Sequence, residues 1–407
     1  MPTASTSAAP ASAPPRRASA RAKALGLLLG LVLSLGLAEI LARVVTRPDP
    51  ATAYALERGR THRSIRGRFY LHDPLLGWRN RPGAAGRIEA PDYACTVALD
   101  ADGRRITAAR PRQPSRRLIV AGDSVAFGYG VEADESFAAR LQAAHPDVEV
   151  VNLAVVGYGT DQELLALRRE LARPAPARPT TVLLAFYVND LHDNLAVNRW
   201  GYRKPRFDVA ADGALTLTGT PVPPPQGSPR VNVLDDRLAT HWRTYALVRP
   251  RVTNLFVRLG WMSAAEGVDD YLGYFVRGRA AEREPAWRVW EAIATQLLRE
   301  VRAAGADLVV LVVPTRVQVS AAARARLARL YGYRDADLAL EEPEERVTGW
   351  GARQGVKVVR ALAPLRQAAA AGPSPYFPFD LHPNARGHHL IAATLEEALA
   401  LGAGARR

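Results

Sequence analysis

The stretch Leu118-Ile-Val-Ala-Gly-Asp-Ser124-Val-Ala-Phe-Gly-Tyr-Gly130 decides how the rest of the chain is interpreted. Its four leading apolar residues, 118–121, predict a short buried strand, and the Gly-Asp-Ser that follows turns the chain sharply at the end of that strand. Open α/β folds bind their ligands at the carboxyl edge of the sheet. Ser124 is therefore a candidate functional residue, provided that other reactive side chains reach the same edge.

Segments with the patterns of strands and helices alternate along the chain after this stretch. Apolar runs predict further strands at 148–153, 181–187, 306–313 and 356–359. Helical spacing predicts helices over 132–144, 160–171, 287–301 and 390–399. Thr160 and Glu163 are expected to form a capping box at the start of the second of these helices. Strands separated by helices predict a parallel sheet with helices on both faces.

Polar residues or glycine follow the predicted strands at the points where the strands end. Ser124 follows the first strand, Gly157 lies in the loop after the second, and Asn189 follows the third. Asp380 and His382 precede the last helix. Because the carboxyl ends of parallel strands share one edge of a sheet, we expect these residues to lie close together.

Each of these residues also has an ordinary structural interpretation. Gly-Asp-Ser is commonly a plain turn, Gly157 in Gly-Tyr-Gly a turn former, and Asn189 a helix cap. His388 and His389 lie close enough in sequence to compete for any role given to His382. The prediction of a site rests on finding all four positions in order, each at a strand-to-helix junction.

Charge and cysteine content narrow the class of protein. The 407-residue chain has a formal net charge of +14, but only three of its 54 basic residues are lysines, and the arginines are scattered. Without a dense basic run or a basic motif interleaved with aromatics, a generally basic surface is favoured and no nucleic-acid partner is expected. The single cysteine, Cys95, excludes an internal disulfide and a multi-cysteine metal site.

The amino-terminal part is expected to hold a tail and a membrane anchor. Residues 1–23 are rich in Ala, Pro and Ser, contain no acid, and predict a disordered basic tail. Residues 24–38 are uncharged, and apolar residues resume after Glu39 up to Val45. A cleaved signal peptide has a similar pattern, but the continued apolar character favours an uncleaved transmembrane helix over 24–46. Such a first segment predicts a single-pass protein whose bulk lies outside the cytoplasm, on the periplasmic side.

Two regions lie outside the alternating pattern. Residues 47–115 are turn-rich and predict a small membrane-proximal β-type extension, with a loosely ordered stalk as the alternative. Residues from about 191 to 284 predict a long irregular insertion that is rich in aromatics. These aromatics either stack on sugar rings or pack the insertion against the core, and packing is favoured. They are Trp200, Tyr202, Trp242, Tyr245, Trp261, Tyr271 and Tyr274.

The residues at the strand ends carry a family resemblance. The four sequence blocks of SGNH hydrolases, the GDSL esterase and lipase superfamily, are matched in order by Ser124 in Gly-Asp-Ser, Gly157, Asn189 in Val-Asn-Asp, and His382 with Asp380. The chain resembles this superfamily over 116–402, and its overall layout resembles membrane-anchored bacterial members. Val125 replaces the usual Leu, and the last block is Asp-x-His where Asp-x-x-His is usual. The resemblance implies a three-layer α/β/α domain over 116–407, with a flavodoxin-like parallel sheet of about five strands.

The resemblance also implies a mechanism through an acyl-serine intermediate, without a metal or cofactor. Ser124 would attack the ester carbonyl, His382 would accept its proton, and Asp380 would orient the imidazole. The oxyanion hole would consist of the backbone N–H groups of Ser124 and Gly157 and the side chain of Asn189.

Three functions remain open at this point. The favoured one is hydrolysis of a small-molecule or carbohydrate ester, in particular a short acyl group on a carbohydrate or cell-envelope substrate. The alternatives are an O-acyltransferase that passes an acetyl group to a polysaccharide, and an anchored polysaccharide-binding protein without turnover. The membrane is an expected partner through the amino-terminal helix, and the sequence identifies no protein partner.

Overall fold

A five-stranded parallel sheet forms the centre of the molecule. The computed structural model of the chain describes residues 20–45, 68–106, 114–173, 179–199, 202–225, 238, 241–259 and 269–399. The strands lie in the order β6-β5-β7-β12-β13, and all neighbouring pairs are parallel. Their bounds are β5 Arg116–Gly122, β6 Val148–Asn152, β7 Thr181–Phe186, β12 Asp307–Val312 and β13 Lys357–Arg360. The five predicted strands are confirmed.

The strand order explains why the predicted strands are continuous apolar runs. β5, β7 and β12 lie inside the sheet, and residues 118–121 of β5 are at most 2% exposed because helices cover both faces. Numbered along the chain, the five strands have the order 2-1-3-4-5, which is the flavodoxin-like arrangement. The predicted three-layer α/β fold is confirmed.

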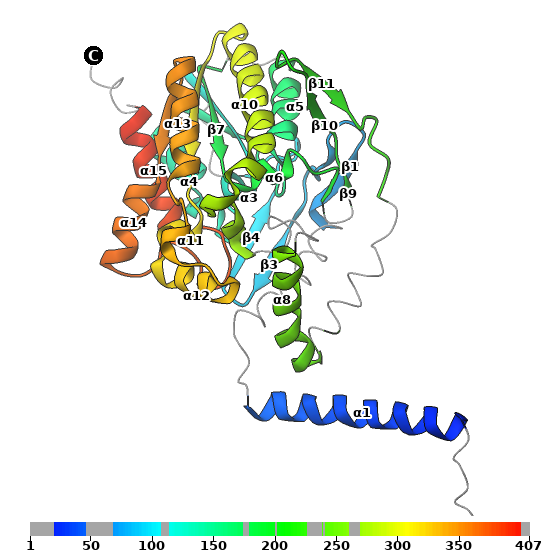
Figure 1. Cartoon of the computed structure of the whole chain (residues 1–407). Coiled ribbons are helices and arrows are strands. Elements are labelled where there is room, and N and C mark those ends of the chain that lie inside the picture. The colour runs from blue at the N-terminus through cyan, green and yellow to red at the C-terminus, as the bar shows by residue number, and fades with distance from the viewer. Residues whose placement is uncertain are drawn as a thin grey trace, which may run out of the picture.

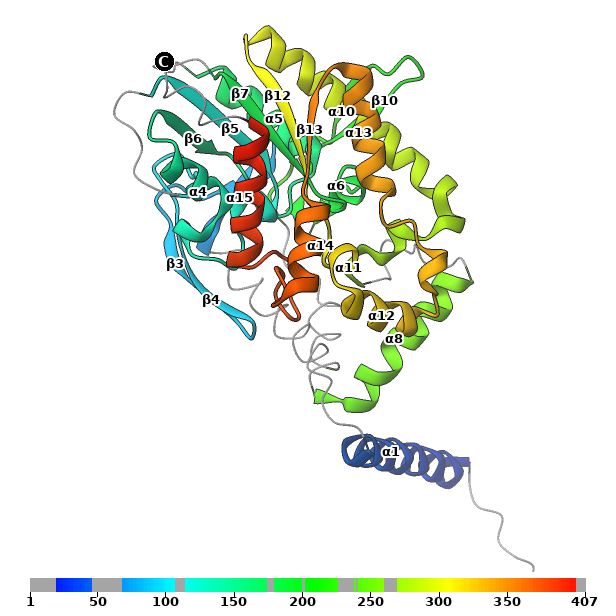
Figure 2. The same cartoon turned by 90° about the vertical axis from the view of Figure 1, so that its left-hand side faces the viewer.

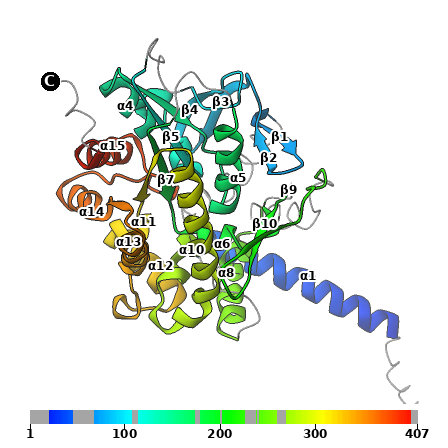
Figure 3. The same cartoon turned by 90° about the horizontal axis from the view of Figure 1, so that it is seen from above.

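Helices cover the two faces of this sheet (Figures 1, 2 and 3). One face carries α4 Phe137–Ala144 and α15 Ala385–Leu399, and the other carries α5 Thr160–Leu171, α10 Ala280–Ala303 and α13 Glu342–Gln354. On the second face, the ring of Trp290 lies 5.1 Å from that of Phe186 in β7 and 5.4 Å from that of Trp350 in α13. These aromatic contacts join both helices to the sheet.

Shorter helices and turns complete the domain. The α-helices are α3 Ser124–Phe127, α6 Asn189–Asp193, α11 Arg316–Val319, α12 Ala321–Tyr331 and α14 Leu362–Ala371. The 3-10 helices are η1 Ala133–Glu135, η2 Asp269–Phe275, η3 Arg277–Arg279 and η4 Asp335–Asp337.

One predicted helix start and one predicted helix cap are wrong. The helix predicted over 132–144 is divided into η1 and α4, because the Ser136 side chain accepts the Ala139 N–H at 3.3 Å and begins a new helix there. The capping box of Thr160 and Glu163 does not form. Thr160 is already the first residue of α5, Gly159 precedes it, and Glu163 is buried in the interior.

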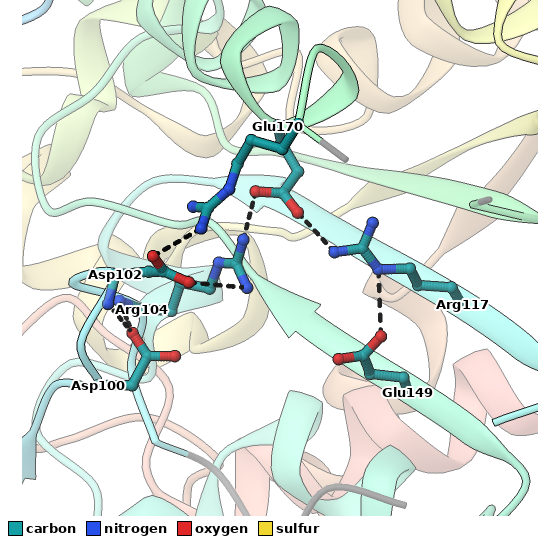
Figure 4. A network of polar contacts seen from close by, with 7 residues as sticks. Asp100, Asp102, Arg104, Arg117, Glu149 and Glu170 are labelled. Carbon is teal, nitrogen blue, oxygen red and sulfur yellow. Dashed lines mark hydrogen bonds and ion pairs between the residues drawn. The ribbon is translucent and has the colours of Figure 1, made fainter. Parts of the chain in front are cut away.

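The described part of the β-type extension packs firmly on the sheet domain. It consists of two antiparallel hairpins, β1 Tyr70–Asp73 with β2 Gly77–Asn80, and β3 Ala85–Ala90 with β4 Tyr93–Ala98. Figure 4 shows the ionic network beside them, in which Glu170 of α5 binds both Arg104 and Arg117. Arg117 lies 2.6 Å from Glu170 and 3.1 Å from Glu149 of β6. Residues 70–106 are therefore a docked element, whereas 46–67 lie outside the described residues.

The region predicted as an irregular insertion contains regular structure, so that description is wrong for its described residues. β8 Asn198–Arg199 pairs with β9 Tyr202–Arg203, and β10 Arg206–Val209 pairs with β11 Leu215–Thr218. A helix, α8 Arg243–Arg258, follows. Trp200 and Trp261 lie outside the described residues.

The amino-terminal apolar segment forms one helix, α1 Ala20–Val45. Its residues Lys23–Val45 are long and apolar enough to cross a membrane, and most of their side chains are exposed. Glu39 is the charged exception that contacts α8, because its carboxylate accepts the backbone N–H groups of Arg243 and Thr244 at 2.8 Å. Of the tail predicted over 1–23, residues 1–19 lie outside the described residues, whereas residues 20–23 form the first turn of α1 and are not disordered.

Candidate active site

Ser124 lies at the carboxyl end of β5, where the order of strands in the sheet reverses. It is the first residue of α3, and the Asp123 side chain caps this short helix by accepting the Val125 N–H at 2.9 Å. Gly122 is required for the turn, because a Cβ there would lie 2.5 Å from the Cβ of Ala126. The sharp turn predicted from Gly-Asp-Ser presents Ser124 at the ligand-binding edge of the sheet.

The structure brings His382 and Asp380 to Ser124. His382 Nε2 lies 2.7 Å from Ser124 Oγ, and His382 Nδ1 forms a hydrogen bond with Asp380 Oδ1. The same carboxylate oxygen accepts the backbone N–H of His382 at 3.0 Å. This double contact explains how the shortened Asp-x-His spacing still presents the carboxylate to the imidazole.

His382 reaches Ser124 from a loop between α14 and α15. The ring of Tyr129 packs beside its imidazole at 4.9 Å. His382 is 6% exposed and Ser124 is 7% exposed, so both side chains are largely shielded from water while still reaching the surface. A hydroxyl, an imidazole and a carboxylate in this order form the arrangement that activates a serine as a nucleophile.

The neighbouring histidines do not occupy this position. His388 is fully buried in α15, and its Nδ1 accepts the backbone N–H of Phe137 at 3.3 Å. Burial lowers the pKa of His388 to about 3, so its imidazole is neutral at physiological pH. His389 is exposed on the outer side of the same helix.

Two further residues expected at the site follow β6 and β7. Gly157, in the loop after β6, has a φ of 79°, in the left-handed region that favours glycine. Asn189 is the first residue of α6, directly after β7. Its amide nitrogen lies 3.0 Å from both Asp123 Oδ2 and Asp193 Oδ2.

Asp123 connects Asn189 with the serine. Its Oδ2 atom accepts hydrogen bonds from Ser124 Oγ at 3.1 Å and from the Asn189 amide at 3.0 Å. The structure thus places the Asn189 side chain beside Ser124. It also shows that the amide hydrogens of Asn189 are directed at carboxylates, a constraint that sequence reasoning did not reveal.

A cluster of five buried carboxyl groups surrounds Asn189. Two cations from the insertion enter this acidic cluster, since Lys204 binds Asp161 and Arg199 lies 3.1 Å from Asp193. Every carboxyl group in the cluster is at most 2% exposed. The members of the acidic cluster are Asp123, Asp161, Glu163, Asp190 and Asp193.

Burial and mutual repulsion raise pKa values in the acidic cluster. Burial raises the pKa of Asp193 to about 6, with the Asp123 charge adding to the effect. Burial and neighbouring carboxylates raise the pKa values of Glu163 and Asp190 well above their usual range. In the part of the chain that the structure describes, both Glu163 side-chain oxygens lack a hydrogen-bond partner, so no donor stabilises a charged Glu163 carboxylate.

The sequence offered only a weak signal for these additional residues. Asp123 is part of Gly-Asp-Ser itself, and Asp190 follows Asn189, but Lys204 and Arg199 come from the insertion.

Among the residues that the structure describes, no group of three or more His, Cys, Asp or Glu is arranged to hold a metal ion.

Comparison with known protein families agrees with this geometry. Residues 120–390 match the model of the GDSL-like lipase/acylhydrolase family. Because this match covers well over half of the chain, the protein belongs to that family. It is a serine hydrolase that acts on ester bonds.

Several solved structures are similar to this chain at low sequence identity. A lipolytic protein of the G-D-S-L family from Veillonella parvula is 13% identical, with 70% of this chain and 99% of that chain covered and a TM-score of 0.39. An acetylxylan esterase from Geobacillus stearothermophilus is 13% identical, with coverages of 70% and 95% and a TM-score of 0.36. A psychrotrophic esterase from Pseudoalteromonas is 12% identical, with coverages of 70% and 97% and a TM-score of 0.35. No curated protein matches the chain.

Proposed function

We propose that Ser124, His382 and Asp380 form the catalytic triad of this ester hydrolase. The observation that carries the proposal is the 2.7 Å contact between Ser124 Oγ and His382 Nε2, with Asp380 on the opposite ring nitrogen. His382 accepts the Ser124 proton as Oγ attacks the ester carbonyl, and later donates it to the departing alkoxide. Asp380 selects the tautomer of His382 and stabilises the imidazolium. Water then attacks the acyl-serine and releases the acid.

The negative oxygen of the tetrahedral intermediate needs hydrogen-bond donors. We assign this role to the backbone N–H groups of Ser124 and Gly157 and to the amide of Asn189. Asn189 already donates to Asp123 and Asp193, so it must exchange one of these carboxylates for the oxyanion. This exchange is favourable in the transition state because the oxyanion carries a developing charge that water cannot reach.

The substrate that we propose is a short acyl ester on a carbohydrate of the cell envelope. Tyr271 supports this assignment, because its ring packs edge-on against Tyr187, two residues before Asn189. Tyr271 is half-buried and has a φ of 58°, an unusual backbone conformation for a bulky residue that is found mainly where function requires it. An aromatic ring beside the site is suited to stack on a sugar.

We further propose that α1 anchors the protein in a membrane as a single pass, with the hydrolase domain on the periplasmic side. In this division, 1–23 form a basic tail, 24–46 the anchor, 47–115 the extension and 116–407 the hydrolase domain. The uncovered apolar surface of α1 supports the anchor. An alkaline phosphatase fusion at the carboxyl terminus tests the orientation, and an inactive fusion would contradict export.

The test of the triad compares the full chain with Ser124→Ala in detergent micelles, using p-nitrophenyl acetate. We expect the variant to lose the enzyme-dependent release of p-nitrophenolate. Equal rates for the two proteins would refute the assignment and would favour an anchored binding protein.

The test of the substrate measures acetate release from acetylated oligosaccharides, with p-nitrophenyl acetate as the reference ester. We expect Tyr271→Ala to raise KM for the oligosaccharide and to leave KM for the small ester unchanged. Equal effects on both esters would contradict a sugar-stacking role. Transfer of the acetyl group to an added sugar in preference to water would instead identify an O-acyltransferase.

A further inference from the structure

The carboxylate of the proposed triad lies on a loop that contains no helix or strand, and Arg316 of α11 contacts this loop by donating to the Pro378 carbonyl at 2.7 Å. Asp380 and His382 belong to the segment between α14 and α15, in which an isolated bridge joins Tyr376 to Pro383. Catalytic groups must be held to within a fraction of an ångström for a reaction of this kind. The loop therefore requires contacts from elsewhere in the molecule to hold Asp380 in place.

The extension supplies such a contact through Asp92, in the turn between β3 and β4. One oxygen of Asp92, Oδ2, accepts the backbone N–H of Phe379 at 2.7 Å and that of Asp380 at 2.6 Å. Hydrogen bonds to an ionised acceptor are about twice as strong as neutral ones. Asp92 therefore holds both peptide groups that lead into the proposed catalytic carboxylate.

The next residue of the extension adds an apolar contact to the same loop. Tyr93 is buried, and its ring lies 4.9 Å from that of Phe377 and 5.8 Å from that of Tyr129. Tyr129 in turn packs beside the His382 imidazole. The β3–β4 turn is thus joined to the His382 loop through one charged contact and one aromatic contact.

The extension is itself held rigidly on the sheet domain. Arg105, just after β4, is buried and donates to the carbonyl oxygens of Phe127 at 2.8 Å and Val131 at 2.6 Å, in the segment that follows Ser124. Arg104 binds Glu170 of α5 (Figure 4). Because these contacts fix the extension on the sheet domain, Asp92 can hold the Asp380 backbone in a fixed position relative to Ser124.

We propose that Asp92 is a positioning residue for the esterase reaction, which fixes the Phe379–Asp380 backbone so that the Asp380 carboxylate stays on His382 Nδ1. This inference rests on the triad proposed above. On this proposal the extension helps to position the active site, and it also connects the proposed anchor to the hydrolase domain. Asp92 has no contact with the reacting atoms and acts only through Asp380.

The experiment measures kcat, KM and the pH dependence of kcat/KM with p-nitrophenyl acetate, for the full chain and the variants Asp92→Ala and Asp92→Asn. We expect Asp92→Ala to lower kcat about tenfold with KM nearly unchanged, because the two hydrogen bonds that hold the Phe379–Asp380 backbone are lost. The Asn variant retains an accepting oxygen and should recover much of the rate. In Asp92→Ala the apparent pKa of the acidic limb of kcat/KM should fall, because a displaced Asp380 stabilises the imidazolium less.

Two comparisons separate positioning from a general loss of stability. The exposed Asp134 lies in η1, and Asp134→Ala serves as the matched control that should behave like the parent protein. In an Asp380→Asn background, Asp92→Ala should cost less than twofold further, since both changes act on the same group. A full additional tenfold loss there, or a parent-like kcat and pH profile in Asp92→Ala, would overturn the inference.

The same series separates this inference from the proposed triad. A parent-like rate in Asp380→Asn would refute the role of Asp380, and with it the role of Asp92. An impaired Asp380→Asn together with an unimpaired Asp92→Ala would refute the positioning role alone.

Discussion

The two sides of Ser124 are built in different ways. On one side, here called the imidazole side, the His382 imidazole contacts Ser124 and a single carboxylate, that of Asp380. Both residues lie on a loop that Asp92 of the extension contacts. On the other, the amide side, Asn189 is held between Asp123 and Asp193, and the insertion supplies Lys204 and Arg199. The imidazole side thus has one carboxylate beside the reacting groups, whereas the amide side has the acidic cluster of five buried carboxyl groups.

The difference indicates what each side contributes to the reaction. In the mechanism proposed above, carboxylates on both sides stabilise the positive imidazolium that forms when Ser124 loses its proton. The same negative charges on the amide side oppose the oxyanion, so the hydrogen-bond donors must act against them. We infer that the raised pKa values of Glu163 and Asp190 limit this opposition, because a carboxyl group that holds its proton carries no charge.

The largest expected effect lies on the imidazole side. His382→Ala removes the base that we propose for Ser124, and we expect kcat to fall by about 10⁴-fold or more, as when a catalytic triad loses its histidine. His389→Ala, on the exposed side of α15, is the control and should keep the parent rate. A rate for His382→Ala close to that of the control would show that another base serves Ser124.

The next effect concerns the stability of the amide side. Lys204 is completely buried and binds Asp161, so Lys204→Met leaves a buried carboxylate without its cation. We expect the free energy of unfolding to fall by about 3–5 kcal/mol, measured by denaturant titration. Lys357→Met, at an exposed position in β13, should change it by much less. Equal losses in both variants would show that the acidic cluster does not depend on Lys204.

Removing the amide itself tests whether the amide side takes part in catalysis. We expect Asn189→Ala to lower kcat by about 10²–10³-fold with a small change in KM, as for other oxyanion-hole donors. Asn198→Ala, an exposed Asn-to-Ala change in β8, is the matched control. If kcat stays at the parent value, Asn189 serves only to hold Asp123 and Asp193 apart.

The smallest effect is a pH dependence of stability. Burial raises the pKa of Asp193 from its ordinary value of 3.8 to about 6 in the folded protein, so between these values the folded state binds more protons than the unfolded state. Its contribution therefore makes the free energy of unfolding fall as pH rises from about 4 to about 6, by up to about 3 kcal/mol, and level off above.

The variant Asp193→Asn removes this titration. Denaturant titrations between pH 4 and pH 7 should show a smaller fall in stability for this variant than for the parent protein. Asp208→Asn, at an exposed position in β10, should keep the parent profile. An identical pH profile in Asp193→Asn and the parent would show that Asp193 does not titrate in this range.

The sequence alone was sufficient to predict the sheet and the order of residues along its edge. Strands such as 118–121 and 181–187 are continuous apolar runs because they are buried on both faces, and such runs can be recognised in the amino-acid sequence. The positions of Ser124, Gly157, Asn189 and His382 could be predicted because each follows or precedes a regular element. Helix caps were less predictable: Ser136 caps α4 within the predicted helix 132–144, and Gly159 is the N-cap of α5 in place of the predicted Thr160.

Only the tertiary structure decided what surrounds those residues. Asp92 meets the backbone of Asp380 across 288 positions of sequence, and Lys204 meets Asp161 from a separate hairpin. Neither pairing produces a periodic pattern in the sequence, because the sequence around a charged turn residue is the same whether its side chain contacts water or a distant peptide group. The burial that raises the pKa of Asp193 likewise depends on elements brought together from several parts of the chain. Local periodicity thus encodes the scaffold, whereas the electrostatic setting of Ser124 arises only when distant segments exclude water together.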